Sequence, residues 1–87
     1  MTVHFRKSFV KDLKALGQPD RVRIEKMILE LEAADTLRDV RHLKKLQGRS
    51  GFFRIRIGDH RVGLTFLSGV ITPVRCLDRK EFYRHFP

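Results

Sequence analysis

Three arginines lie close together in the stretch RIRIGDHRVGLTF, which covers residues 54–66. Arg54, Arg56 and Arg61 are interleaved with apolar residues, and Asp59 is the only acidic residue among them. A guanidinium group stays charged at neutral pH and donates two parallel hydrogen bonds to a phosphate, so neighbouring arginines suit phosphate binding. We therefore predict that this stretch forms an anion-binding surface rather than an ordinary solvated face.

The residue pattern also predicts the strands that place these arginines. Apolar and polar residues alternate on both sides of Gly58-Asp59, a dipeptide that suits a two-residue hairpin turn. The resulting register sets Arg56 opposite Arg61 and sets the third arginine opposite Gly63, which leaves open space beside the cluster. Like charges paired in this way destabilise a sheet unless something anionic separates them.

A third strand is expected to add a fourth arginine to this face. Its core-facing residues are predicted to be Val70, Thr72, Val74 and Cys76. This alternation requires a three-residue loop over 67–69, and that loop pairs Arg61 with Arg75. Pro73 cannot donate to a strand ladder, so it indicates a sheet edge or a bulge.

The first half of the chain predicts two helices that cover the sheet. Ser8 is placed to cap a helix that ends at Gly17, and Pro19 suits the first turn of a second helix. A short strand with Val3 and Phe5 is expected before them, and residues 35–51 are expected to form a loop with some helix. The second helix presents one apolar face, made of Ile24, Met27, Ile28 and Leu31.

The C-terminal segment DRKEFYRHFP predicts a short helix. Asp78 and Glu81 have the spacing of a capping box, and two phenylalanines four residues apart would anchor the helix. Arg79 and Tyr83 are also four residues apart and would project together toward the arginines. Cleavage of RNA by its own 2′-hydroxyl needs proton transfer, which arginine cannot perform as a base. The candidates for that role are Tyr83, His85, a lysine, or the RNA and its surroundings.

The composition points to a polyanionic partner. The chain has 87 residues, 19 Lys and Arg against 10 Asp and Glu, and a formal charge of +9. Nucleic acid, an anionic membrane surface or an acidic protein would each match this charge. A basic run precedes the hairpin, and although such runs often form only a solvated face, we predict that its members Lys44, Lys45 and Arg49 bind RNA together with Arg75.

Other features narrow the class of protein. The length and the absence of repeats predict one domain over residues 1–87. Cys76 is the only cysteine and has apolar neighbours, so a buried thiol in a cytoplasmic protein is expected. The four histidines have no metal-ligand spacing, and from the residue pattern we expect neither a signal peptide nor a membrane-spanning segment. We therefore expect no metal, no small-molecule cofactor and no membrane partner.

Two stretches resemble the RelE/ParE superfamily of bacterial toxins, and they are closest to its RelE-like branch. They are LKKLQGRSGFFRIRIGDHRVGLTF and VRCLDRKEFYRHFP, in which basic residues and turn glycines recur in the order typical of that superfamily. The resemblance covers nearly the whole chain. It implies an α+β fold, with a small antiparallel β-sheet, two N-terminal helices packed on one face and a short C-terminal helix.

The resemblance also implies a function. RelE-like toxins of type II toxin-antitoxin systems are metal-independent endoribonucleases that cut mRNA in the A site of the 30S ribosomal subunit, and an acidic antitoxin neutralises them. The residues that match the catalytic positions of the family are Arg54, Arg56, Arg61, Arg79 and Tyr83, with His85 as an alternative to Tyr83.

Two departures from the family pattern affect these assignments. Arg54 and Arg56 stand where well-known RelE proteins carry lysines, and the spacing from Arg79 to Tyr83 is shorter than in those proteins. Two other functions remain open at this point. One is a ParE-like inhibitor of DNA gyrase, and the other is a non-catalytic module that binds nucleic acid.

Overall fold

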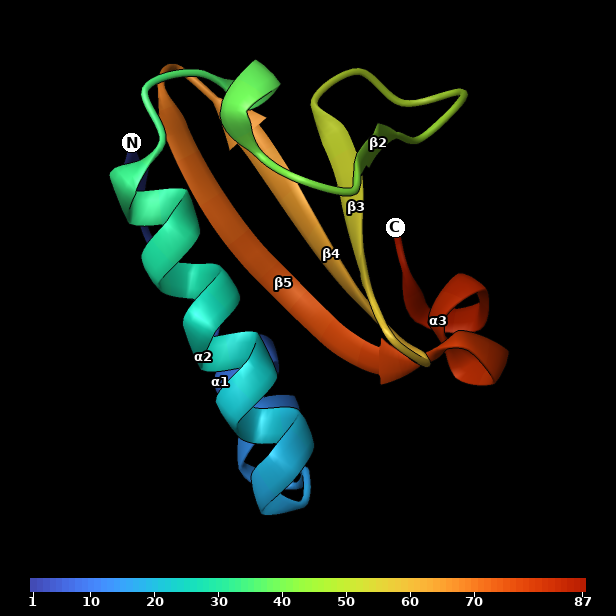
Figure 1. Ribbon diagram of the computed structural model, residues 1–87. Coiled ribbons are helices and arrows are strands. Elements are labelled where there is room, and N and C mark those ends of the chain that lie inside the picture. The colour runs from blue at the N-terminus through green and yellow to red at the C-terminus, as the bar shows by residue number, and fades with distance from the viewer.

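The computed structural model describes residues 1–87 as three α-helices and a five-stranded sheet (Figure 1). The strand order is β1-β5-β4-β3-β2; β1 is parallel to β5, and every other pair is antiparallel. The predicted α+β class is confirmed. In chain order the elements are β1 (Thr2–Val3), α1 (Lys7–Lys14), α2 (Gln18–Ala33), the 3-10 turn η1 (Leu37–Asp39), β2 (Leu43–Lys45), β3 (Phe52–Ile57), β4 (His60–Leu67), β5 (Val70–Asp78) and α3 (Arg79–His85).

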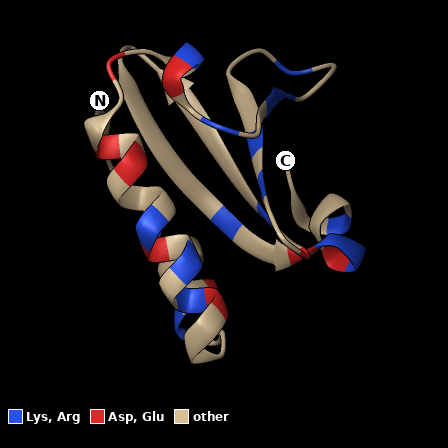
Figure 2. Cartoon of the chain, in the orientation of Figure 1, with Lys and Arg blue, Asp and Glu red and all other residues tan.

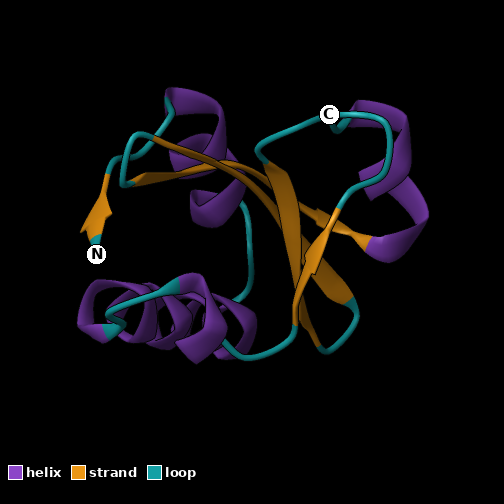
Figure 3. Cartoon of the chain, turned by 90° about the horizontal axis from the view of Figure 1, so that it is seen from above, coloured by secondary structure: helices purple, strands orange, loops and turns teal.

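The sheet separates two groups of helices. Figures 1 and 3 show α1 and α2 on one face of the sheet, here called the inner face, and α3 on the opposite, outer face. The main core lies between the sheet and the first two helices, and it is closed by apolar side chains from both layers. Its buried members are Phe9, Ile24, Met27, Leu31, Ile55, Val62, Leu64, Ile71 and Cys76.

The two N-terminal helices are present as predicted, but both ends of α1 differ: α1 ends at Lys14, and Gly17 is the N-cap of α2. Pro19 lies in the first turn of α2, as its pattern predicts. Arg6, not Ser8, is the N-cap of α1, because the Ser8 hydroxyl donates to the Val74 carbonyl oxygen at 2.6 Å and so ties α1 to β5. The opening strand is shorter than predicted, and Phe5 lies outside it with 45% of its surface exposed.

The hairpin between β3 and β4 confirms the predicted register. Gly58 and Asp59 form the turn, and the positive φ of 58° at Gly58 shows why glycine suits this position. Arg56 pairs with Arg61 across the strands. Arg54 pairs with Gly63, so all three hairpin arginines have the predicted positions.

The predicted connection between β4 and β5 is wrong. Ser68 and Gly69 form a two-residue turn with φ values of 51° and 79°, and Leu67 pairs directly with Val70. This register places Ile71 in the core in place of the expected Val70, Thr72 and Val74. Together with a β-bulge in β5, this turn pairs Arg61 with Leu77, so the predicted pairing of Arg61 with Arg75 is also wrong.

A β-bulge in the third long strand accounts for the broken alternation. Leu64 pairs with Pro73 and Gly63 pairs with Arg75, which leaves Val74 as an extra residue of β5. The bulge brings Cys76 into the core, where it is 2% exposed, as predicted. Pro73 lies beside the bulge, one of the two positions that its missing N–H group allows.

Residues 35–51 contain a strand that sequence periodicity did not reveal. The expected helical turn is present as η1, but residues 43–45 form β2 and pair with β3. This strand is only 3 residues long, too short for alternation to mark it.

No helix of the chain has the length and apolar character needed to span a membrane.

Candidate nucleic-acid interface

The outer face carries the hairpin arginines in adjoining positions. Lys44 pairs with Arg54 across β2 and β3, and Arg56 pairs with Arg61 across β3 and β4. Because directly paired residues of neighbouring strands project on the same face, these four cations lie together. Figure 2 shows basic residues along β2, β3 and α3, near the C-terminal end of the chain.

Two hydrogen bonds hold Arg61 against the hairpin turn. Its Nη1 atom donates to the carbonyl oxygens of Gly58 at 3.1 Å and His60 at 3.0 Å. Its Nε and Nη2 atoms donate to no protein group. Arg61 is therefore oriented by backbone carbonyls while part of its guanidinium group stays available to a ligand.

The four paired cations of the outer face, Lys44, Arg54, Arg56 and Arg61, have no carboxylate partners. Of the 19 Lys and Arg residues, only Arg23, Arg75 and Arg84 have a carboxylate oxygen within 4.0 Å. Arg54 makes one long contact, from Nη1 to the His42 carbonyl oxygen at 3.5 Å. The cluster therefore lacks the counter-charge that a purely structural role would supply, and a phosphate would provide it.

Arg75 does not join this cluster. Its Nε atom donates to Asp12 of α1 at 2.7 Å and its Nη2 atom donates to the second carboxylate oxygen at 3.2 Å. This hydrogen-bonded partner raises the pKa of Arg75. The same carboxylate accepts the backbone N–H of Cys76 at 2.9 Å, so Asp12 closes the edge of β5. Unlike the hairpin arginines, Arg75 therefore has a carboxylate partner, and its binding of RNA stays a prediction.

The open space predicted beside Gly63 is filled by the C-terminal segment. A Cβ atom added at Gly63 would lie 2.5 Å from the Phe86 ring. Phe82 and Phe86 are buried, and their ring centroids lie 5.4 Å apart. The ring centroids of Phe86 and Phe52 lie 5.8 Å apart. Gly63 therefore allows the end of α3 to dock on the outer face, and the two phenylalanines anchor it as predicted.

Docking of α3 brings the remaining candidate residues to the side of the sheet that carries the arginines. Asp78 caps α3 by accepting the Lys80 N–H at 2.9 Å, and the Arg79 N–H donates to the Asp59 carbonyl oxygen of the hairpin turn at 2.8 Å. Tyr83 is 60% exposed. His85 lies 3.7 Å from Glu81, and neither Tyr83 nor His85 forms a hydrogen bond with a hairpin arginine.

Two of the predicted RNA-binding residues lie away from the paired cations. Lys45 pairs with Phe53 and so belongs to the inner face, opposite to Lys44. The guanidinium carbon of Arg49 lies 5.3 Å from the centre of the Phe52 ring, a cation-π contact at the margin of the outer face. Lys44 is therefore the member of this group that lies directly beside the hairpin arginines.

The sequence did not predict that Asp12 binds Arg75 or that Phe86 packs over Gly63. Two signals were available in the sequence: Asp12 is the single acidic residue among the lysines of α1, and Gly63 lies opposite Arg54. Neither signal indicates which distant residue would contact it. No group of three His, Cys, Asp or Glu side chains comes together as a metal ion would require. The chemistry that the site offers is charge stabilisation by arginine, with hydroxyl and imidazole groups nearby on α3.

Comparison of the sequence with known proteins shows its family. No protein-family model matches the chain. The chain is 39% identical to toxin RelE3 of Methanocaldococcus jannaschii over 88 residues, which covers 100% of both sequences.

Solved structures agree with this relationship. A chain of the RelB-RelE antitoxin-toxin complex of Methanococcus jannaschii superposes with a TM-score of 0.82 at 36% identity, covering 95% of this chain and 98% of that one. A chain of the RelE-RelB complex of Pyrococcus horikoshii OT3 gives a TM-score of 0.74 at 26% identity, covering 93% and 97%. With a curated relative at 39% identity over its whole length, this chain belongs to the RelE family of toxins.

Proposed function

We propose that this RelE-family toxin cleaves mRNA on the ribosome and thereby arrests translation. The observation that carries the proposal is the direct pairing of Arg56 with Arg61, next to Arg54 and Lys44, without any carboxylate to balance them. Like charges held opposite one another destabilise a sheet by up to about 1 kcal/mol for each pair. Binding of a phosphate would offset that repulsion.

The proposed reaction uses the RNA as its own nucleophile. The ribose 2′-oxygen bonds to the adjacent phosphorus, the bond from phosphorus to the 5′-oxygen breaks, and a 2′,3′-cyclic phosphate and a 5′-hydroxyl result. One proton leaves the 2′-hydroxyl and one reaches the departing 5′-oxygen. Arg54, Arg56 and Arg61 would stabilise the negative charge that develops on the phosphate oxygens.

Proton transfer is assigned to α3. Tyr83 and His85 both have exposed side chains on this helix, and Arg79 begins it next to the hairpin turn. To separate them, Tyr83→Phe and His85→Gln should be compared in a translating extract. The residue that transfers the proton should lower the cleavage rate by about a hundredfold or more, while the other variant stays near the wild-type rate.

We also propose an acidic antitoxin as the partner of this toxin. The similar archaeal proteins were solved as complexes with RelB. The formal charge of +9 favours an acidic protein segment over the outer face, where it would compete with RNA. A protein that co-purifies with the toxin and prevents its activity in the extract would support this partner.

The proposed cleavage is tested by adding the purified protein to a translating extract and mapping mRNA ends. We expect new ends within translated regions, and none when ribosomes are omitted. Translation arrest with intact transcripts would contradict the proposal. A gyrase supercoiling assay in parallel distinguishes a ParE-like inhibitor, because a ribosome-dependent nuclease leaves DNA supercoiling unchanged.

A further inference from the structure

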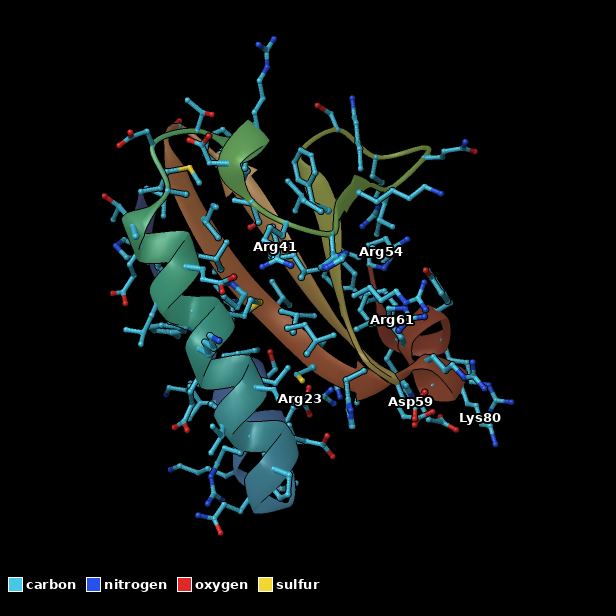
Figure 4. All side chains as sticks on the ribbon, in the orientation of Figure 1. Arg23, Arg41, Arg54, Asp59, Arg61 and Lys80 are labelled. Carbon is cyan, nitrogen blue, oxygen red and sulfur yellow. The ribbon has the colours of Figure 1, made fainter.

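A second basic site lies on the inner face, in a cleft of about 350 Å³ between α2 and the end of β3. Figure 4 shows Arg23 and Arg41 on the α2 side of β3, whereas Arg54 and Arg61 lie on the side of α3. The cleft opens on the other face of the sheet from the arginine cluster described above and shares Arg56 with it. Its polar lining consists of Arg23, Lys26, Glu30, Arg41, His42 and Arg56.

The cleft exists because β2, which is antiparallel to β3, begins opposite Ile55 and does not reach the end of β3. Leu43 pairs with Ile55, and beyond that pair the only link is a hydrogen bond from the Arg56 N–H to the His42 carbonyl oxygen at 3.4 Å. The last residues of β3 therefore have no strand on that side. The gap between this strand end and α2 is the cleft.

Charge in the cleft is poorly balanced. Glu30 is the only acidic residue that lines it. Arg23 is 4.0 Å from Asp20, and both side chains are largely exposed, so this pair is weak. Lys26 and Arg41 have no carboxylate within 4.0 Å. An anionic ligand is therefore the natural complement of this cleft.

Arg56 connects the two basic sites. It pairs with Arg61 on the outer face, and it also lines the cleft, because it lies on the strand end that forms the border between them. Arg23 also reaches this border, since a Cβ atom at Gly58 of the hairpin turn would lie 2.9 Å from its Nη1 atom. Positive charge therefore continues around the open edge of β3.

The floor of the cleft favours a phosphate chain over an amphipathic peptide. Met27, Ile55 and Ile57 line it; the first two are only 6% and 2% exposed, and Ile57 is half-buried. An acidic peptide that anchors by apolar side chains would find only one partly exposed apolar side chain there, that of Ile57. A nucleic-acid strand carries one negative charge per nucleotide and can follow the basic border from one face to the other.

We propose that this cleft binds a second phosphate of the same RNA, a few nucleotides away from the bond cleaved on the outer face. The inference rests on the proposed function and extends it, because it makes the RNA-binding surface continue around the sheet edge. Arg23, Lys26 and Arg41 bind this phosphate and position the RNA; they do not take part in the bond-breaking step.

The test uses RNA that cannot be cleaved. Binding of a 2′-O-methyl decanucleotide and of a 2′-O-methyl trinucleotide is measured by fluorescence anisotropy at several salt concentrations. The cleft variant is Arg23→Gln/Arg41→Gln, and the matched control is Arg6→Gln/Arg38→Gln, which removes the same charge from exposed positions outside the cleft. Thermal unfolding verifies that both variants are folded.

We expect the cleft variant to bind the decanucleotide at least about fivefold more weakly than the control does, with a salt slope smaller by about 0.7 per lost phosphate contact. Both variants should bind the trinucleotide equally, because it covers the outer face alone. Equal decanucleotide binding by the two variants would overturn the inference. So would a cleft variant that loses affinity for an oligoglutamate peptide but not for RNA.

The same experiment separates this inference from the proposed function. Binding of the 2′-O-methyl probe does not depend on cleavage. If the wild-type protein leaves mRNA intact in the translating extract but the cleft variant still loses decanucleotide affinity, only the proposed reaction fails. If mRNA is cleaved but the two variants bind alike, only the cleft inference fails.

Discussion

Arg61 and Arg75 occupy neighbouring strands of one sheet but stand in opposite electrostatic surroundings. Asp12 accepts two hydrogen bonds from Arg75, the shorter at 2.7 Å, and the ion pair is largely buried against α1. Arg61 faces Arg56 and is held only by backbone carbonyl oxygens. The pair of Arg75 with Asp12 stabilises the fold without a ligand. The positive charges of Arg61 and Arg56 have no counter-charge and can bind an anion. The presence of a carboxylate partner therefore distinguishes the structural arginine from the proposed functional ones.

The largest effect is expected on the rate of mRNA cleavage when Arg61, the arginine without a carboxylate partner, is replaced. Arg61→Leu should lower mRNA cleavage in a translating extract by a hundredfold to about a thousandfold, since one donor to a developing phosphate charge is lost. The free energy of unfolding should change by less than about 1 kcal/mol, because a like-charge pair is also relieved. Arg38→Leu, at an exposed position, is the control. Retained cleavage would place the site elsewhere.

Disruption of the pair between Asp12 and Arg75 is expected to affect mainly the stability of the fold. Asp12→Ala should lower the free energy of unfolding by about 3 kcal/mol, because it leaves Arg75 and the Cys76 N–H group without their partner. Urea denaturation measures this change. Arg23→Ala, which breaks the exposed 4.0 Å pair with Asp20, should change it by less than about 1 kcal/mol. Equal effects of the two variants would show that burial of the Asp12 pair is unimportant.

Gly63 pairs with Arg54 on one side and with Arg75 on the other. Substitution of this glycine shows how closely α3 must pack on the sheet. Gly63→Ala places a methyl group about 2.5 Å from the Phe86 ring, so the end of α3 must move. We expect a loss of about 2 kcal/mol in stability and a lower cleavage rate. Gly48→Ala is a contrasting variant without a steric clash, although its φ of 82° adds backbone strain. A fully active Gly63→Ala protein would separate α3 from the reaction.

The smallest predicted effect concerns Cys76, next to the Asp12 pair. Burial raises the pKa of its thiol from 9.0 to about 12, and the charges of Asp12 and Asp20 add to the shift. Because the folded protein holds this proton more tightly, the contribution to stability is complete below pH 9.0 and is lost as the pH rises toward about 12.

Urea denaturation at about pH 8 and about pH 10 measures this loss. Wild type should lose about 1 kcal/mol more than Cys76→Ala over this interval. The comparison with the variant removes every contribution that the two proteins share. An identical pH dependence in the two proteins would contradict a buried, protonated thiol.

The hairpin was predictable because its information is local. The dipeptide Gly58-Asp59 selects a two-residue turn, and alternation on both sides then fixes the pairing of Arg56 with Arg61. The short helix that begins after Asp78 and the apolar face of α2 were predictable for the same reason, since caps and periodicity act within one element.

The turn at Ser68-Gly69 shows where local reasoning failed. A two-residue turn contradicts uniform alternation along β5, but the extra residue at the bulge resolves the contradiction. A bulge is selected by packing against the neighbouring strand and by the N–H group that Pro73 lacks, so sequence periodicity alone does not locate it. Strand β2 was missed because its 3 residues are defined only by pairing with β3.

The sequence by itself determined the family, the basic character of the chain and the pairing of the hairpin arginines, because each follows from residue order and short-range turn chemistry. Only the tertiary structure decided which arginines stay without a carboxylate. It brought Asp12 to Arg75 across 63 residues of chain, placed Phe86 over Gly63 and opened a basic cleft beside Arg56. These contacts join distant segments, and whether a charge is balanced depends on such contacts rather than on its neighbours in sequence.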